Sequence, residues 1–537
     1  MTSSATPTTL TTLTTTATAT ARNGKNASRQ RKAGPATVVL RSIEDIRRYF
    51  ATRERKVYFV SASNFNMIDM HRQVQGWHNI NLLDCFDGGH PATTVVQDDH
   101  SRVFSGIEDV NHYLMDSPVV RDLLESRSDV RKARGLGPDT PKDQVLFLFF
   151  DAALEDKCRR LGLEVALPPN ALVREVDSKL VTTEIGNAAG VASVPHAIAR
   201  VRSYADLQRI ASDAGLGARW VVQAAYGDSG KTTYFIDDAQ DYERVAEKIE
   251  AQDAVKVMRR LRCVGTAIEA CATRWGTVVG PLLTELIGRE ELTPYAGGWC
   301  GNENYAVAFT PDLRARVQQK TVAFGNALYR RGYRGTFELD FLLDLDSGEI
   351  YLGELNSRIT GVTALTNTSD FSRAHVPLFL FHLLEFDVQV DLQLDLQAFN
   401  QSVLAHGASG TASQIILKHT GYMHRRIEQA PVSGVYRLTD HGLVLVAAGV
   451  ERDAAQGDDF AFLLRIQQAG EYAYRGGDMA ILFMNTMIGE AQGELNALGQ
   501  RWTQALKDSF VLRDLDPQER SAIAGAHHPA NVKGAGE

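Results

Sequence analysis

Four polar side chains with the chemistry of a magnesium–polyphosphate site lie within residues 335–363. Asp340 falls on one predicted strand, and Glu354, Asn356 and Arg358 fall on the next strand or just past it. Residues two apart in a strand point the same way, so the last three share a face. A tight acidic turn between the strands can bring Asp340 onto that face. Mg²⁺ binds a few such oxygens together with water and phosphate, and arginine grips phosphate or carboxylate bidentately.

The alternative is an acidic hairpin on a solvated sheet face. Composition favours a site, because apolar residues alternate with acidic ones along the first strand and leave one face largely acidic. Carboxylates set among apolar residues are costly to leave unpaired, so a metal or an arginine is expected as their partner. The apolar positions are Phe337, Leu339, Phe341 and Leu343.

A glycine-containing loop, YGDSGK at 226–231, separates two predicted strands. It differs from a Walker loop because Ala225 stands at the first glycine position and because a strand, not a helix, follows. Such a strand–loop–strand flap can close over phosphates with backbone N–H groups, the Ser229 and Thr232 hydroxyls and the Lys231 ammonium. A solvated β-turn is the alternative.

Three features occur in order: a helix start at Lys179 within Asp-Ser-Lys, the glycine-rich flap, and the acidic hairpin. In this order they resemble the ATP-grasp superfamily, and more narrowly its biotin-carboxylase-like members. The resemblance is strong over 170–370 and looser out to about 510. It implies an α/β and α+β fold with a Rossmann-like N-terminal domain, a flap subdomain, a C-terminal ATP-grasp subdomain and a lid.

The resemblance also implies roles for individual residues. Gln223 stands where the family usually has a second phosphate-contacting lysine, which leaves neutralisation of the phosphates to Lys231 or Lys179. Residues 256–259 fall at the hinge that contacts adenine. The implied ATP-binding residues are Lys179, Gln223, Ser229, Gly230, Lys231, Thr232, Val257, Met258 and Glu269; the metal ligands are Asp340, Glu354 and Asn356; the catalytic residues are Arg358 and Lys231; and the substrate contacts are Arg358, Trp299, Glu303 and Gly361.

The residues after the hairpin distinguish subfamilies. Arg358 is followed by ITGVT, which looks like carboxylate–amine ligases, whereas biotin carboxylases have a Gln-Val-Glu-His run. We therefore expect an ADP-forming ligase that joins a carboxylic acid, an amino acid or peptide, to an amine through an acyl phosphate, with ATP and Mg²⁺ (or Mn²⁺). Glu285 and Glu303 are candidates for the base, and the alternative is that an amine supplied neutral needs none. The alternatives are a biotin-carboxylase-like subunit and a non-catalytic nucleotide-binding module.

Composition bounds these hypotheses. The 537 residues are 44% hydrophobic and 23% charged, with a net charge of -8, which indicates a globular protein and argues against a nucleic-acid partner. Five scattered cysteines suit a reducing cytoplasm rather than a disulfide framework, and no apolar run reaches membrane-spanning length. The resemblance implies small-molecule substrates and a homodimer.

Alternating strand and helix patterns predict the domain organisation. Residues 1–35, rich in Thr, Ala and Ser, are expected to be a disordered tail, with an organellar transit peptide as the alternative. Strands at 56–62, 80–87 and 145–150 predict a parallel α/β domain over 50–170. The remaining predicted units are an ATP-grasp core at 171–390 with its flap at 219–255, a helix at 238–252, a long loop at 289–309, a helix at 311–332, a lid at 391–515 and a tail at 516–537.

Overall fold

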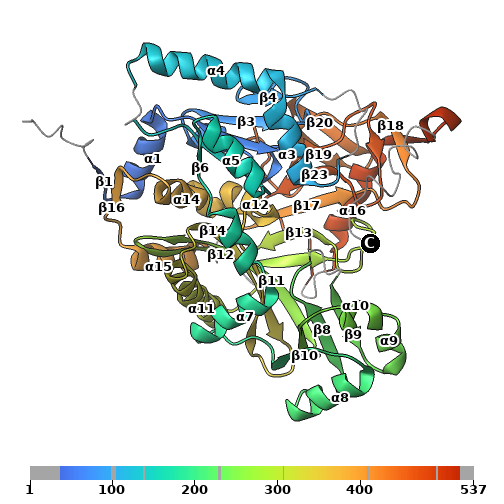
Figure 1. Cartoon of the computed structure of the whole chain (residues 1–537). Helices are drawn as coiled ribbons and strands as arrows, with labels where there is room; N and C mark the ends of the chain where they lie inside the picture. Colours follow the sequence, from blue (N-terminus) through green and yellow to red (C-terminus); the bar gives the residue numbers. More distant parts are fainter. Residues whose placement is uncertain are drawn as a thin grey trace, which may run out of the picture.

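The computed structural model of the chain describes residues 37–97, 104–136, 140–227, 232–305, 308–407, 410–490 and 494–520. Strands in these residues form five sheets, three of which position the candidate site. In Figure 1 the N-terminal α/β layer lies beside the C-terminal strands, and the flap lies at the opposite end of the molecule.

The N-terminal sheet is entirely parallel, as predicted, with the order β4-β3-β2-β5-β6. The predicted strand at 80–87 is wrong: β3 lies earlier, and Asp84 accepts the N–H groups of Phe86 and Gly88, which turns the chain. The strands are β2 (Val57–Ser61), β3 (Trp77–Asn81), β4 (Thr93–Val95), β5 (Gln144–Phe147) and β6 (Glu164–Val165); the helices are α1 (Ile43–Thr52), α2 (Met70–Gln73), α3 (Ile107–Asp116), α4 (Pro118–Ala133) and α5 (Ala152–Arg160), with η1 (Phe65–Met67).

The next segment leads into the flap. Helix α6 (Asn170–Val176) is followed by α7 (Lys179–Ala188), which begins at Lys179, where a helix start was predicted. The flap is an antiparallel sheet in the order β7-β10-β8-β9. Its elements are β7 (His196–Ala199), α8 (Tyr204–Asp213), β8 (Trp220–Ala224), β9 (Thr233–Ile236), α9 (Ala239–Glu243), α10 (Ala246–Glu250) and β10 (Val255–Arg259), so the helix expected at 238–252 is divided in two.

An antiparallel sheet of ten strands forms the body of the molecule. The order of its strands is β15-β14-β11-β12-β13-β17-β23-β21-β19-β20. It runs without a break past residue 390, because β13 pairs with β17. Its strands are β11 (Cys263–Thr273), β12 (Gly276–Ile287), β13 (Trp299–Asn304), β14 (Gly335–Asp344), β15 (Ile350–Asn356), β17 (Ala412–Lys418), β19 (Gly434–Thr439), β20 (Gly442–Ala448), β21 (Phe460–Arg465) and β23 (Asp478–Met484).

Helices cover this sheet. The predicted helix at 311–332 is α11 (Pro311–Arg330), capped by the Thr310 side chain. The apolar run near 380 forms α14 (Phe379–Glu385), every residue of which is buried. The other helices are α12 (Gly361–Thr368), α13 (Asp370–Ala374), α15 (Leu396–Gly407) and α16 (Ala497–Asp508).

Two smaller sheets complete the fold. One contains β1 (Val38–Leu40) and β16 (Val390–Leu392), and the other contains β18 (Arg425–Gln429), β22 (Tyr472–Ala473) and β24 (Val511–Asp514).

The predicted loop at 289–309 is wrong in its second half, where β13 forms between β12 and β17. The residues of β13 are mostly polar, so a strand was not expected. They are nevertheless buried, because their side chains form hydrogen bonds with neighbouring groups. The Asn302 amide donates to the Thr284 carbonyl (3.0 Å) and accepts from the Trp299 indole (2.8 Å). Satisfied polar groups of this kind can occupy the interior of a sheet.

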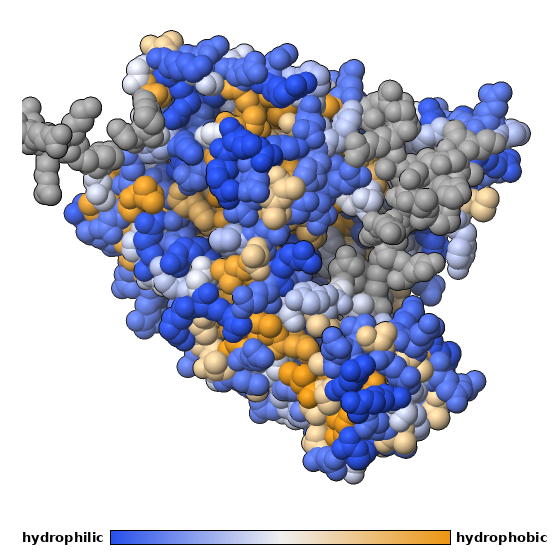
Figure 2. Space-filling view, in the orientation of Figure 1, coloured by the Kyte–Doolittle hydropathy of each residue, from blue (hydrophilic) through white to orange (hydrophobic). Residues whose placement is uncertain are grey.

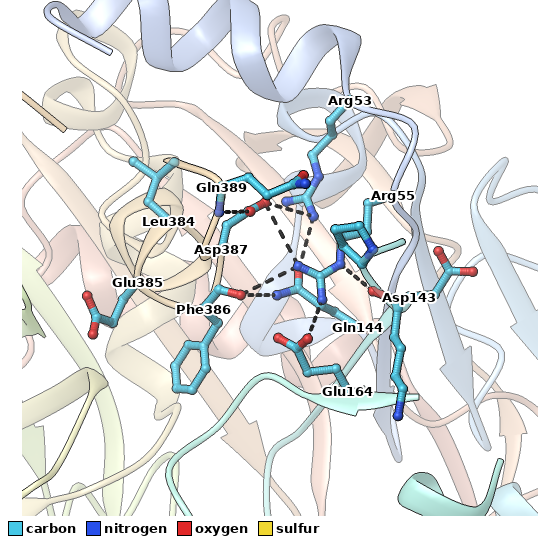
Figure 3. A network of polar contacts seen from close by, with 12 residues as sticks. Arg53, Arg55, Asp143, Gln144, Glu164, Leu384, Glu385, Phe386, Asp387 and Gln389 are labelled. Carbon is cyan, nitrogen blue, oxygen red and sulfur yellow. Dashed lines mark hydrogen bonds and ion pairs between the residues drawn. The ribbon is translucent and has the colours of Figure 1, made fainter. Parts of the chain in front are cut away.

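A buried ion network joins the N-terminal sheet to the chain just after α14 (Figure 3). Arg53 and Arg55 both approach Asp387, and their side chains are 3% and 9% exposed against 4% for the carboxylate. Gln144 accepts from Arg53 and donates to the Phe386 carbonyl. The network fixes the N-terminal layer against the body.

The outer surface is mostly hydrophilic on the face in Figure 2, with apolar residues in small patches. At the end of the ten-stranded sheet, β20 exposes Val444, Leu445 and Val446. None of the helices in the described ranges has the length and apolar character needed to cross a bilayer.

Candidate active site

The acidic hairpin forms as predicted, with β14 and β15 paired antiparallel. Asp340 stands directly opposite Glu354, and Glu338 stands opposite Asn356. A bulge leaves Gly353 unpaired, and a Cβ there would lie 3.0 Å from the Asp340 carbonyl oxygen, so glycine permits this close approach. The two predicted carboxylate ligands therefore share one face of the sheet.

Asn356 and Arg358 extend this arrangement as a chain of hydrogen bonds. The Asn356 Nδ2 donates to Asp340 Oδ2 at 3.3 Å, and the Arg358 Nη2 donates to Asn356 Oδ1 at 3.2 Å. The other oxygen of Asp340, Oδ1, is buried and has no hydrogen-bond partner among the described residues. An orphaned buried carboxylate oxygen is costly, and it is available to a ligand.

Two further carboxylates surround Asp340. Burial first, and then the charges of Glu285, Glu338 and Glu354, raise the pKa of Asp340 well above its ordinary value. Burial first, and then the charge of Glu354, also raise the pKa of Glu338, opposed by the Thr360 hydroxyl and the charge of Arg358. The pattern of alternating acidic residues indicated Glu338, but its position opposite Asn356 depends on the strand register.

Glu285 reaches this cluster from β12, across β11. A Cβ at Gly265 would lie 2.7 Å from the Glu285 Oε2, so glycine at this position gives the side chain room. Burial and the charges of Glu338 and Glu354 raise the pKa of Glu285 to about 8. The glutamate named as one candidate base therefore does lie beside the predicted metal ligands.

Lys179 links the start of α7 to this cluster and to the flap. Its Nζ donates to Glu354 Oε1 at 2.5 Å and to the Gly227 carbonyl at 2.8 Å, and its side chain is only 5% exposed. Its backbone N–H donates to the Ala225 carbonyl. Burial raises the pKa of nearby Asp177, opposed by the charge of Arg358. The predicted phosphate-contacting lysine and a predicted metal ligand are thus brought into contact.

The N-terminal domain completes one side of the site. The guanidinium of Arg358 lies over the Phe149 ring, 4.7 Å from its centroid, at the carboxyl end of β5. The Asn66 amide donates to the Thr360 carbonyl at 2.8 Å. In open parallel sheets ligands bind at the carboxyl ends of the strands, so this placement agrees with a site at this edge of the sheet.

Glu269 lies on β11 beneath the start of α12. The Thr363 hydroxyl donates to its Oε1 at 2.5 Å and the Thr336 hydroxyl at 3.3 Å. The carboxylate is 2% exposed, and burial raises its pKa to about 7. Its direct neighbour across the strand pair is Glu338.

Of the predicted substrate contacts, Trp299 and Gly361 pack against one another, whereas Glu303 binds the backbone of residues 488 and 489. The Trp299 indole lies against Gly361, where a Cβ would lie 2.1 Å from the ring, so glycine lets the ring pack on the start of α12. Glu303 is buried, and its Oε1 accepts the N–H groups of Ile488 (2.6 Å) and Gly489 (3.0 Å). Burial raises the pKa of Glu303.

The flap brings together residues whose relation the sequence did not reveal. Gln223 on β8 stands directly opposite Lys256 on β10, and its amide donates to the Thr233 hydroxyl at 3.1 Å. The sequence placed Lys256 in the predicted hinge at 256–259 but gave this lysine no role of its own; the available signal was a lysine between two valines. Val257 is fully buried in the flap core and Met258 is 6% exposed.

The glycine-rich loop is described only in part. Thr232 lies against Gly227, where a Cβ would lie 2.1 Å from the threonine Oγ1, and its carbonyl accepts the Ala224 N–H. The predictions for Ser229, Gly230 and Lys231 fall outside the described residues.

The donor set fits a hard divalent cation held jointly with phosphate. Among the described residues, no three His, Cys, Asp or Glu side chains form a closed metal cage. Mg²⁺ does not need one, since it takes one or two carboxylates and fills its remaining positions with water and phosphate oxygens. Asp340 and Glu354 stand opposite one another, and Asp340 Oδ1, which accepts no hydrogen bond from the described residues, is an oxygen that can ligate a metal.

Comparison with known proteins identifies the fold. The biotin carboxylase of Campylobacter jejuni matches at a TM-score of 0.54 and 11% identity, over 89% of this chain and 96% of that chain. The biotin carboxylase domain of Hydrogenobacter thermophilus 2-oxoglutarate carboxylase, a dimer in complex with MgADP, ADP and bicarbonate, matches at 0.52 and 12%, over 89% and 95%. The chain has the ATP-grasp fold. The fold class predicted from the sequence is thus confirmed.

Sequence comparison adds a distant relative. No family model matches the chain. A [butirosin acyl-carrier protein]–L-glutamate ligase of Niallia circulans is 22% identical over 266 residues, which is 48% of this chain and 61% of that protein. The chain therefore matches less than two thirds of that relative's length.

Proposed function

We propose that this ATP-grasp protein is an ADP-forming ligase that joins a carboxylic acid, an amino acid or peptide, to an amine through an acyl phosphate. The observation that carries the proposal is the register of the hairpin, which sets Asp340 opposite Glu354 with Arg358 and the Lys179 ammonium beside them. Two carboxylates next to two cations suit a metal–triphosphate complex and the acid that it phosphorylates.

In the first step a carboxylate oxygen of the substrate attacks the γ-phosphorus of ATP. The bond from that phosphorus to the β,γ-bridging oxygen breaks, and ADP leaves with the electron pair. Arg358 orients the substrate carboxylate, and Lys179 balances the charge of the phosphates. Asp340, Glu354 and Asn356 would hold Mg²⁺, which supplies positive charge at the phosphate oxygens.

In the second step the amine nitrogen attacks the acyl carbon. The bond between that carbon and the phosphate oxygen breaks, inorganic phosphate leaves with the electron pair, and the amine gives up a proton. We assign Glu285 as the acceptor of that proton, since it lies in the cluster and its pKa is raised to about 8, close to the operating pH of a general base. The alternative, Glu303, already uses its Oε1 to accept two backbone N–H groups.

The ITGVT run after Arg358 supports an amine acceptor over biotin carboxylation. The glutamate ligase relative supports an amino acid as the activated acid, and its name places that acid on an acyl-carrier protein. A carrier-borne acceptor is therefore the second candidate. We also expect a homodimer, the state described for the 2-oxoglutarate carboxylase domain.

Release of ADP and phosphate across a panel of acid–amine pairs tests the proposal. We expect turnover only with both an acid and an acceptor present, and only with Mg²⁺ or Mn²⁺. Bicarbonate-dependent turnover with biotin, and no response to amino acids, would overturn the proposal in favour of a carboxylase. Turnover only with an acyl-carrier protein would show that the acceptor is carrier-borne and not a free amine.

Glu354→Ala is the matched variant, and we expect it to abolish metal-dependent ADP release. Glu349→Ala is its control, because Glu349 is an exposed glutamate on the same hairpin. Full activity of Glu354→Ala would show that the metal assignment is wrong.

A further inference from the structure

Lys256 is an almost completely buried lysine in the flap. Its side chain is among the largest that are fully buried, with only 1% of the residue exposed. No hydrogen-bond or ion-pair partner of its Nζ is found in the described ranges. A buried ammonium without a partner is costly, so a binding partner for it is expected.

The strand pattern shows which way this side chain points. Val255 and Val257 on either side of it belong to the apolar core of the flap. Successive residues of a strand point to opposite faces, so Lys256 points away from that core. Helix α7, which begins at Lys179, packs against β10.

The packing of α7 on β10 brings Lys256 close to Lys179 and so to the site already described. Burial first, and then the positive charge of Lys179, lower the pKa of Lys256 to about 8, and the charge of Glu354 opposes this. Lys179 itself contacts Glu354. A bound polyanion would stabilise two ammonium groups that lie beside the predicted metal ligand Glu354.

The register relates Lys256 to the missing lysine of the family. Gln223 and Lys256 stand directly opposite one another on neighbouring antiparallel strands, β8 and β10. Directly opposite residues project from the same face with their Cβ atoms about 5 Å apart. A lysine on either strand can therefore bring its ammonium into the same space.

We propose, on the basis of the function proposed above, that Lys256 supplies the second cation that binds the ATP phosphates, in place of the lysine that Gln223 replaces. In this proposal the second ammonium comes from β10 instead of β8 and lies on the same face of the flap sheet. Gln223 is then a neutral neighbour, held by its hydrogen bond to the Thr233 hydroxyl.

An exchange of the two side chains tests this. Binding of Mg²⁺ with the non-hydrolysable ATP analogue AMPPNP, and separately of adenosine, is measured by calorimetry for the wild type, Lys256→Gln and the double variant Lys256→Gln with Gln223→Lys. Loss of one charge-assisted contact should weaken AMPPNP binding by about 10- to 100-fold and leave adenosine binding unchanged. The double variant should recover at least 10-fold of that loss.

Lys248→Gln serves as the control, because Lys248 is an exposed lysine of the same flap, and it should bind AMPPNP like the wild type. Thermal unfolding of each variant shows whether it is folded. Equal AMPPNP affinity of the wild type and Lys256→Gln would overturn the inference, as would a folded double variant without recovery. Failure of the wild type to bind AMPPNP at all would instead overturn the proposed function.

Discussion

Replacing Glu269 by glutamine should remove a pH-dependent destabilisation of the folded protein. Burial raises the pKa of this carboxyl from 4.5 to about 7, so the folded state holds a proton that the unfolded chain releases. The carboxyl therefore contributes its full stability below pH 4.5 and loses it as the pH rises to about 7.

The magnitude follows from that interval. One pKa unit corresponds to about 1.4 kcal/mol, and integration from about pH 5 to about pH 7.5 gives a loss of about 2 kcal/mol for the wild type that the glutamine variant avoids. Glutamine keeps an Oε1 that can accept from the hydroxyls of Thr363 and Thr336. Any constant cost of its amide cancels when the two pH values are compared.

Urea unfolding of both proteins at these two pH values, without nucleotide or metal, measures the difference. In thermal unfolding the same effect is about 2 °C, because the unfolding entropy of 537 residues is about 1 kcal/mol per degree. Glu290→Gln is the control, since Glu290 is exposed. Equal losses of stability in all three proteins would refute the reasoning, because Glu269 would then ionise in the folded protein as it does in water.

Three further substitutions test contacts around the site, each by urea unfolding. Gly361→Ala should cost about 1–3 kcal/mol, because the new Cβ meets the Trp299 ring, and Trp299→Phe in the same chain should relieve part of that cost; no cost would contradict the contact. Asp387→Ala should cost about 3–5 kcal/mol by leaving the buried Arg53 without the carboxylate that balances its charge, and a cost below about 1 kcal/mol would show that the network is dispensable. Glu303→Ala should cost about 1–3 kcal/mol through the loss of an acceptor for two N–H groups, whereas Glu303→Gln should keep most of the stability; a stable Glu303→Gln without ligase activity would instead indicate a substrate contact.

Local patterns predicted the parts of the site that lie close in sequence. The β14–β15 hairpin could be predicted from the alternation of apolar and acidic residues and the tight turn, whereas the pairing of Asp340 with Glu354 also needs the bulge at Gly353, which no local pattern indicated. The start of α7 at Lys179 was likewise visible as a helix signal.

Relations that depend on register between distant strands could not be predicted. Glu285 joins the cluster only because β11 lies between β12 and β14, with Gly265 leaving space for its side chain. The proposed role of Lys256 depends on the strand register, which sets it opposite Gln223 on β8. Strand β13 was missed because its polar side chains carry no apolar pattern, although their hydrogen bonds let them be buried.

The unbroken ten-stranded sheet has a practical consequence for handling the protein. A fragment that ended near residue 390 would lack β17 and would leave the edge of β13 with a row of unpaired N–H and C=O groups. Such an edge is a template for aggregation. We therefore expect truncations in the C-terminal third to precipitate rather than yield a smaller folded protein. We also expect β12, which carries Glu285, and the C-terminal strands to exchange their amide hydrogens as one cooperative unit.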